Sequence, residues 1–241
     1  MNAEASEPSI TFLTDPGSFD GETLDIVGAA YQHLFRSRRL ASGAELRVVD
    51  GAGRARRGTV TEIERKCAVV VLGEPLPSNE PRRSVHLVVG ALKPERADWL
   101  VEKATELGVV SITFVATERT PRRYGDGRLD RLSRVAAAAV EQCRRSRLPE
   151  IRAVLPWDEA LAELDGPSSA VLDGAGRPVR EEISGLPEDA AVTLFVGPEG
   201  GFTADELEDL KTRGVSPWRL GGTVLRVETA AVAAAAWVLA D

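Results

Sequence analysis

The alternation of strand-like and helix-like segments after residue 82 constrains the fold of this chain most. The apolar run 85–92 is typical of a buried strand, and 95–107 has helical spacing, with Pro94 at its start and Gly108 just past its end. Further strands are predicted over 111–117, 170–173, 192–197 and 217–220, and further helices over 128–145, 203–213 and 227–239. This order predicts an α/β domain over 82–241, with helices on both faces of a parallel sheet.

The first third of the chain has a different pattern. Segments 45–50, 57–63 and 67–72 are short β-rich runs, joined by a hairpin-length turn at 51–53 and a polar connection at 64–66. A meander of this kind over 24–74 predicts a small β-barrel or half-barrel, within an N-terminal domain over 1–75. The proline-rich stretch 75–81 that follows is the best linker in the chain.

Composition argues against several classes of protein. The chain has 241 residues, of which 43% are hydrophobic and 28% charged, as in ordinary globular proteins. The apolar stretch 230–240 is too short to cross a bilayer, and the acidic N-terminus does not resemble a signal peptide. Two cysteines and two histidines are too few for a disulfide framework or a typical metal centre. We therefore expect a cytoplasmic protein without a metal.

The formal net charge of −7 conceals a segregation of charge. Basic residues outnumber acidic ones nine to four over 31–66 and ten to four over 119–152, whereas acidic residues outnumber basic ones sixteen to six after residue 152. The local field, rather than the total charge, decides whether a phosphate backbone is bound. The alternative explanation is an arginine-rich surface that reflects a GC-rich genome. The candidate phosphate ligands are Arg36, Arg38, Arg39, Arg119, Arg122, Arg144, Arg145 and Arg147.

Three predicted strand ends carry glycine, at 172–174, 196–201 and 220–222. Ligands of parallel sheets bind at the carboxyl ends of strands, and glycine lets a backbone approach them closely. Taken singly, a glycine after a strand is more often a simple turn. The middle segment, with the sequence GPEGG, is more informative, but it lacks both the Walker and the Rossmann pattern. Together the three ends predict a site for an adenine-bearing ligand.

Five motifs then follow one another in a distinctive order: EKATELGV at 102–109, TERT at 117–120, EQCRRSRLPEI at 141–151, VGPEGGFT at 196–203 and LGGTVLRVETA at 220–230. In these motifs the chain resembles the RsmE family of 16S ribosomal RNA uridine N3-methyltransferases, within the SPOUT superfamily. The resemblance covers roughly residues 25–240, and the last two motifs are its most specific part.

The resemblance implies a PUA-like β-barrel for RNA, followed by a trefoil-knotted SPOUT domain that dimerises. The implied cofactor is S-adenosyl-L-methionine, and the implied partner is 16S ribosomal RNA in the small ribosomal subunit. The apolar final helix suits burial in the knot or against a second subunit. The expected cofactor-binding residues are Leu172, Val196, Gly197, Pro198, Glu199, Gly200, Gly201, Leu220, Gly221, Val224 and Leu225.

Arg226 is the preferred catalytic residue, because a fixed guanidinium can stabilise charge on the uracil carbonyl oxygens. Its alternative role is to bind RNA phosphate or to hold the knot. Glu228 could accept a proton or orient Arg226, although a structural ion pair is an equally good explanation. The loop departs from the family at Gly222, Thr223 and Val227, where proline, a basic residue and threonine are usual. The segment 9–12 also lacks an arginine that is common in the family.

Two other functions remain open at this stage. The chain could methylate another base in ribosomal or transfer RNA, or it could be a non-catalytic RNA-binding protein of ribosome assembly.

Overall fold

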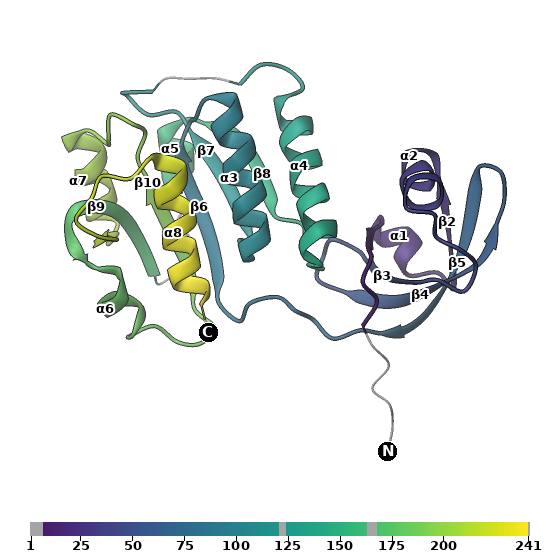
Figure 1. Cartoon of the computed structure of the whole chain (residues 1–241). Helices are drawn as coiled ribbons and strands as arrows, with labels where there is room; N and C mark the ends of the chain where they lie inside the picture. The colour runs from purple at the N-terminus through teal and green to yellow at the C-terminus, as the bar shows by residue number, and fades with distance from the viewer. Residues whose placement is uncertain (1–6, 121–123, 163–167, 241) are drawn as a thin grey trace. The chain divides into compact units, whose positions relative to one another are not determined.

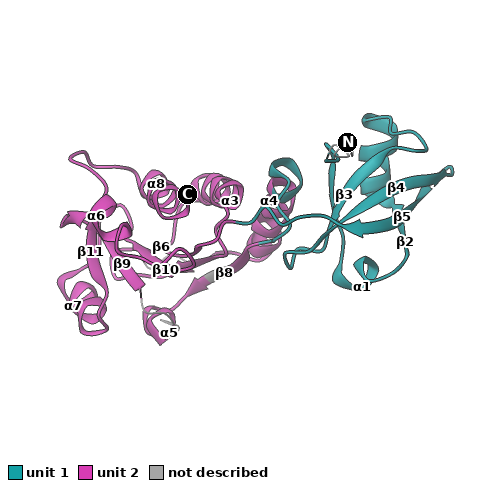
Figure 2. Ribbon diagram, turned by 90° about the horizontal axis from the view of Figure 1, so that it is seen from below, with its two compact units in different colours: residues 1–80, 140–148 teal, residues 81–139, 149–241 magenta. Residues whose placement is uncertain are grey.

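The computed structural model describes residues 7–120, 124–162 and 168–240. The chain divides into two compact units (Figure 2). Unit 1 comprises residues 1–80 together with 140–148, and unit 2 comprises 81–139 together with 149–241.

Unit 1 is built on a five-stranded sheet with the order β1-β3-β4-β5-β2. Antiparallel pairing of β3 with β4 and of β4 with β5 confirms the predicted meander and its hairpin turn. The sheet also gains two strands that the sequence pattern did not predict, β1 beside β3 and β2 beside β5. The elements are β1 (Thr11–Leu13), α1 (Pro16–Phe19), β2 (Thr23–Val27), α2 (Gly28–Tyr31), the π-helix η1 (Gln32–Ser37), β3 (Glu45–Val49), β4 (Ala55–Ile63) and β5 (Cys67–Pro75).

Alternate residues of these strands form the core of unit 1. Leu46, Val48, Val60 and Val70 are all buried. Gly58 lies at a close approach between strands, because a Cβ atom there would lie 2.7 Å from methyl groups of both Val48 and Val70. A side chain at residue 58 would therefore force neighbouring strands apart.

A buried ion pair joins residues 140–148 to the rest of unit 1. Arg145 Nη2 lies 2.7 Å from Glu80 Oε2, with both side chains largely buried. The other oxygen, Glu80 Oε1, accepts hydrogen bonds of 2.9 Å from the backbone N–H groups of Ser146 and Arg147. Arg145 was predicted as a phosphate ligand, but its guanidinium is buried and engaged by a carboxylate.

Unit 2 has a six-stranded sheet with the order β11-β9-β10-β6-β7-β8, and every pair in it is parallel. This confirms the predicted α/β class. The elements are β6 (Ser84–Gly90), α3 (Pro94–Leu107), β7 (Ser111–Val115), α4 (Arg128–Cys143), β8 (Glu150–Leu155), α5 (Trp157–Ala162), β9 (Ser168–Pro178), α6 (Val179–Ile183), β10 (Ala191–Val196), α7 (Ala204–Thr212), β11 (Ser216–Arg219) and α8 (Val227–Leu239).

Local signals set the ends of two helices as predicted. Gly108 ends α3 in a left-handed conformation with φ of +105°. At the start of α7, Thr203 and Glu206 form the reciprocal bonds of a capping box. The sheet lies between α3 and α8 on one side and α5 and α7 on the other (Figure 2).

Helix α8 packs beside α3 and against β6 and β10 (Figure 1). Its buried residues are Val227, Glu228, Ala231, Ala234, Ala235 and Val238. The opposite side is not covered within the chain, since 46% of Trp237 is exposed. The apolar residues of α8 therefore contribute both to the core of unit 2 and to its exposed surface. Across the described residues, no helix is long and apolar enough to span a membrane.

The Glu80–Arg145 pair predicts a measurable, pH-dependent contribution to stability. We expect Glu80→Gln to lower the free energy of unfolding at pH 7 by about 3 kcal/mol, because Arg145 would remain buried without a counter-charge. Glu188→Gln, which removes an exposed partner of Arg82, is the matched control and should change stability by less than about 0.5 kcal/mol. Urea unfolding of the three proteins measures both differences.

The effect of pH follows from the surroundings of Glu80. Burial alone would raise the pKa of this carboxyl group, but the hydrogen bonds and charge of Arg145, with two backbone N–H groups, outweigh it and hold the pKa below its usual value. The stabilisation is thus complete above the unfolded-state pKa and is lost as pH falls through the lower folded-state value. The gap between the parent protein and Glu80→Gln should narrow below about pH 4. A gap that stayed constant down to about pH 3 would contradict this account.

Candidate functional site

A cavity of about 530 Å³ lies where the middle of β9 and the end of β10 meet the first turn of α8. A neighbouring hollow of about 480 Å³ shares part of its wall, including Leu172, Val224 and Leu225. Except for Gly200, every residue predicted to bind the cofactor lines one of the two. The structure therefore brings the three glycine-bearing segments together, but the predicted strand end at 172–174 is wrong, because β9 continues through Gly174 to Pro178. Those lining the larger cavity are Leu172, Val196, Gly197, Pro198, Glu199, Gly201, Val224 and Leu225, and those lining only the hollow are Leu220 and Gly221.

The first wall of the cavity is the loop 197–203, between β10 and α7. It passes so close to the end of β6 that a Cβ atom on Gly90 would lie 2.7 Å from the Pro198 nitrogen. Within the loop, the Gly201 N–H donates to the Pro198 carbonyl over 2.7 Å, and Gly201 has a φ of +70°. Glycine at these positions permits the tight turn and the close approach to the sheet.

Two charged side chains fix this loop to the segment 117–120 that follows β7. Arg119 Nη1 donates to the carbonyl oxygens of Gly200 and Phe202. The buried carboxylate of Glu206 accepts one hydrogen bond from the Glu118 N–H and another from the Thr203 N–H, each 2.8 Å long. Arg119, predicted as an RNA ligand, is thus engaged by the backbone of the loop. The capping-box spacing predicted the contact of Glu206 with Thr203, but it did not predict the hydrogen bond from the Glu118 N–H.

The second wall is the loop 220–226, which leads into α8. Val224 is fully exposed and Leu225 is 38% exposed. Apolar side chains presented to a cavity in this way suit a flat, apolar ring face. Arg226 is exposed at the N-cap of α8 and lines the cavity, where the catalytic prediction requires it.

The departures from the family pattern lie in and beside this second loop. Gly222 has no positive φ, and a Cβ atom added to it would meet no other atom within 4 Å, so nothing in the fold requires glycine there. Gly222 and Thr223 line the neighbouring hollow, and Val227 lines the larger cavity.

Arg96 is a charged residue of the cavity that the sequence did not reveal. It lies in the first turn of α3, with Nη1 2.8 Å from Glu199 Oε1 and Nε 3.7 Å from Glu228 Oε1. Glu228 itself is buried and does not line the cavity, and its Oε2 accepts no hydrogen bond from the described residues. Glu228 therefore pairs with Arg96, which agrees with the structural ion pair that the sequence left open beside a role in orienting Arg226 or accepting a proton. The sequence signal that could have located Arg96 was its position at the start of the helix predicted after strand 85–92.

The remaining predicted RNA ligands that the structure describes lie in unit 1. Their side chains are exposed at the surface, and Arg36 packs over the ring of Tyr31 and donates to the Arg65 carbonyl over 3.2 Å. Arg39 and Arg144 adopt left-handed backbone conformations. Arg122 lies outside the described residues. The exposed members of the set are Arg36, Arg38, Arg39, Arg144 and Arg147.

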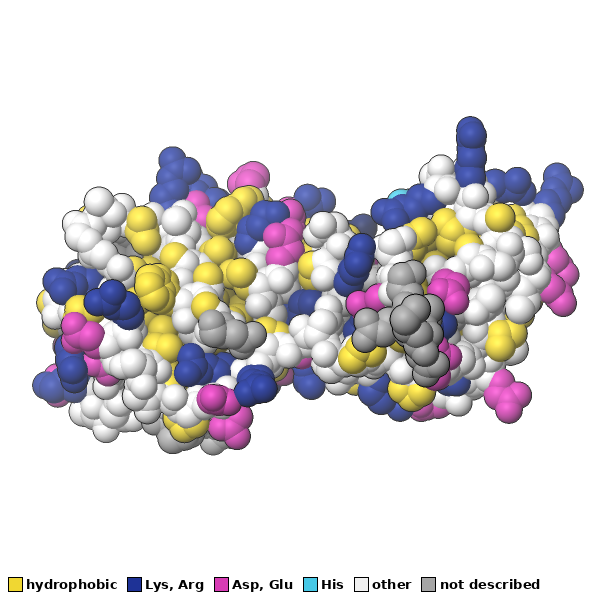
Figure 3. Space-filling view, turned by 60° about the horizontal axis from the view of Figure 1, so that its bottom comes forward, with side chains coloured by type: hydrophobic (Ala, Val, Ile, Leu, Met, Phe, Trp, Pro, Cys, Tyr) yellow, Lys and Arg dark blue, Asp and Glu magenta, His cyan; other side chains and the backbone are white. Residues whose placement is uncertain are grey.

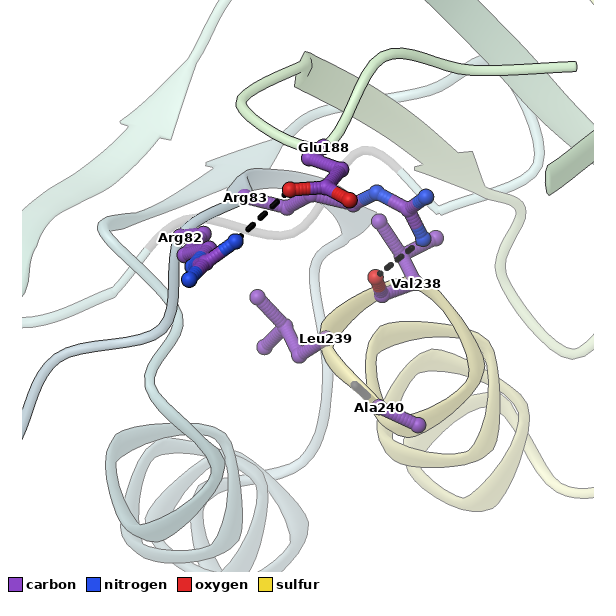
Figure 4. A pocket seen from close by; sticks show the side chains of 6 residues that line it. All are labelled: Arg82, Arg83, Glu188, Val238, Leu239 and Ala240. Atoms are coloured by element: carbon purple, nitrogen blue, oxygen red, sulfur yellow. Dashed lines mark hydrogen bonds and ion pairs between the residues drawn. The ribbon is translucent and has the colours of Figure 1, made fainter. Parts of the chain in front are cut away.

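Another cavity, at the end of α8, offers no comparable site. Arg82 is paired with Glu188, and Arg83 donates to the Val238 carbonyl (Figure 4). Its cationic groups are therefore engaged by the protein itself. Within 7–120, 124–162 and 168–240, no group of three histidine, cysteine or acidic side chains is placed to hold a metal ion.

Comparison with known proteins agrees with this architecture. A family model described as an RNA methyltransferase domain matches residues 78–239, and one described as an RNA methyltransferase PUA domain matches residues 27–72. The latter match confirms that the N-terminal sheet is of the PUA type.

Individual relatives extend the likeness over nearly the whole chain. A ribosomal RNA small subunit methyltransferase E of Mycobacterium bovis is 34% identical over 242 residues, which cover 94% of this chain and 89% of the relative. The Synechocystis protein of the same name is 29% identical over 222 residues, which cover 90% and 72%. The solved structure of the Neisseria gonorrhoeae enzyme of that name, bound to S-adenosyl methionine, superposes with a TM-score of 0.82 at 25% identity, covering 94% and 95%. The chain belongs to the ribosomal RNA small subunit methyltransferase E family.

Proposed function

We propose that this chain transfers a methyl group from S-adenosyl-L-methionine to N3 of a uridine in 16S ribosomal RNA of the small ribosomal subunit. The observation that carries the proposal is the cavity formed by loops 197–203 and 220–226, with Arg226 on its wall. The likeness to the Neisseria structure with its bound cofactor supports the same assignment.

The residues present fit the proposed cofactor. Backbone groups of 196–201 and 220–225 can hydrogen-bond to an adenine edge, while Phe202, Leu207 and Leu225 offer apolar contact to its ring. Such binding depends on backbone position, so it tolerates the departures at Gly222 and Thr223. When bound, S-adenosyl-L-methionine supplies an electrophilic methyl group on a positively charged sulfur.

Arg226 is the residue that we assign to the chemical step. The reaction breaks the methyl–sulfur bond, forms a bond from the methyl carbon to uracil N3 and releases the N3 proton. As that proton leaves, negative charge spreads onto the two carbonyl oxygens of the ring, where a guanidinium stabilises it. Alignment of the methyl donor and N3 by the two loops supplies the rest of the rate enhancement. Glu228 is screened from the cavity, so we assign it to ion pairing with Arg96 rather than to proton transfer.

We assign RNA binding to the exposed arginines of unit 1. Arg36, Arg38, Arg39, Arg144 and Arg147 have guanidinium groups that can contact phosphate oxygens, which position an RNA without reading its sequence. The functional division that we propose is RNA binding by the domain 1–75, with Arg144 and Arg147 beside it in unit 1, and methyl transfer by the rest of 82–241. A ribosomal RNA substrate also implies a cytoplasmic location.

We infer that the active form is a homodimer. Trp99 on α3 and Trp237 on α8 are 41% and 46% exposed on neighbouring helices. Figure 3 shows apolar side chains gathered on the visible face of unit 2, with charged groups around them. An exposed apolar face of this kind is typical of a subunit interface. The trefoil knot implied by the family resemblance stays a prediction.

A different RNA target is the second candidate function. The departures at Gly222, Thr223 and Val227 favour it, because these residues line the two hollows where the family usually has other side chains. They alter the surface offered to the target base more than they alter the backbone that would hold the cofactor.

Methyl incorporation from a radiolabelled donor tests the proposed reaction. We expect incorporation into small subunits or naked 16S ribosomal RNA, and Arg226→Ala should reduce it by on the order of 100-fold because the developing charge loses its cation. Arg213→Ala, an exposed substitution at the end of α7, is the control and should leave incorporation unchanged. RNA binding without incorporation by the parent protein would instead indicate the non-catalytic alternative.

The contacts of Arg119 predict a defect in cofactor binding. We expect Arg119→Ala to weaken the affinity for S-adenosyl-L-methionine about tenfold, since Gly200 and Phe202 lose the donor that holds their carbonyl groups. Arg213 also donates to a backbone carbonyl, that of Asp209, so Arg213→Ala is a matched control that should bind normally. Calorimetric titration measures the dissociation constants. Unchanged affinity in Arg119→Ala, together with weaker RNA binding, would support a role for Arg119 as an RNA ligand instead.

A further inference from the structure

Arg96 occupies a position between the two walls of the cavity. It lines the cavity from the first turn of α3, and 30% of its side chain is exposed. Its two carboxylate partners lie in different parts of unit 2. Glu199 lies in loop 197–203, whereas Glu228 lies in the first turn of α8, two residues after Arg226.

Both loops lie within the described residues, and no backbone hydrogen bond runs between 197–203 and 220–226. Loop 197–203 is instead fixed to the segment 117–120, on the side of Arg119 and Glu206. The ion pairs of Arg96 thus link loop 197–203 to the start of α8, the helix into which loop 220–226 leads.

The charges favour a guanidinium at this point. Glu228 is 7% exposed, and a buried carboxylate needs a nearby cation or a set of hydrogen-bond donors. The N-terminus of α8 supplies part of this stabilisation and Arg96 supplies the full positive charge. A planar guanidinium can donate to two carboxylates at once. The ammonium group of lysine is a single point charge and is less suited to this role.

We propose that Arg96 is a positioning residue that sets the separation of the two walls, and thereby places Arg226 relative to the bound cofactor. This inference rests on the proposed function of the cavity. Arg96 acts through Glu199 and Glu228, and no direct role in the chemical step is assigned to it. Loss of its charge releases loop 197–203 from α8, so both cofactor binding and the alignment of Arg226 deteriorate.

Three variants of the full-length protein test this role. Arg96→Gln should weaken binding of S-adenosyl-L-methionine about tenfold and reduce the rate constant for methyl transfer at saturating cofactor on the order of 100-fold, as expected for misplaced catalytic groups. Arg96→Lys keeps the charge and should recover part of both losses. Arg131→Gln removes another ion pair of α3, with Asp98, away from the cavity, and should behave as the parent protein.

A double-mutant cycle separates positioning from general destabilisation. If Arg96 acts through the loop, Glu199→Gln should have little further effect on cofactor affinity once Arg96→Gln is present, because the two residues form one interaction. Additive effects would overturn the proposal, as would Arg96→Gln affinity and rate constants within about twofold of the parent values. A melting temperature lowered in Arg96→Gln by as much as in Glu80→Gln, with no recovery in Arg96→Lys, would show a purely structural role and would also overturn it. Failure of the parent protein to bind the cofactor would instead contradict the proposed function.

Discussion

Parallel pairing of β9 with β10 and β11 is the constraint on which the rest of unit 2 depends. Because neighbouring parallel strands point the same way, segments far apart in the sequence reach one edge of the sheet together. Leu172, Val196 and Leu220 are brought to the same region in this manner. The loops that leave this edge then need to be held, and charged side chains from α3, α7 and the segment 117–120 hold them.

The charged residues around the cavity divide into two kinds. Arg119, Glu206 and Arg96 are engaged by loop backbone or by carboxylates, so they order the site. Arg226 is exposed on the cavity wall, so its charge is available to a bound molecule. Rigid surroundings around the exposed Arg226 would suit the proposed reaction, in which alignment matters most and charge develops on the acceptor ring. Under the proposed function, the site would combine a fixed backbone for the cofactor with a separate cation, Arg226, for the base.

The sequence predicted much of this arrangement, for identifiable physical reasons. Strand–helix alternation predicted the parallel sheet, and Pro94, Gly108, Thr203 and Glu206 marked helix ends because caps act within a few residues. The strands β1, β2 and β8 and the short helices α5 and α6 were not predicted, because such short segments depend on tertiary contacts more than on their own periodicity.

The candidate site, like the fold, was predicted from the sequence only in part. Glycine-bearing strand ends and motif order located the loops, whereas the partners of each arginine could not be inferred. Nothing in the local sequence distinguishes Arg145, buried against Glu80, from the exposed Arg144 beside it, and Arg96 meets Glu199 and Glu228 only after α3 and α8 have packed together. Long-range ion pairs of this kind arise from the fold, so periodicity and spacing do not report them.

The most direct measurement of the central claim is the modified-nucleoside content of 16S ribosomal RNA from cells that lack this protein. The account predicts that one N3-methyluridine is lost and that the parent gene restores it, whereas the Arg226→Ala gene does not. An unchanged level of N3-methyluridine would contradict the proposed target, and loss of a different methylated nucleoside would identify the RNA base on which the chain acts instead.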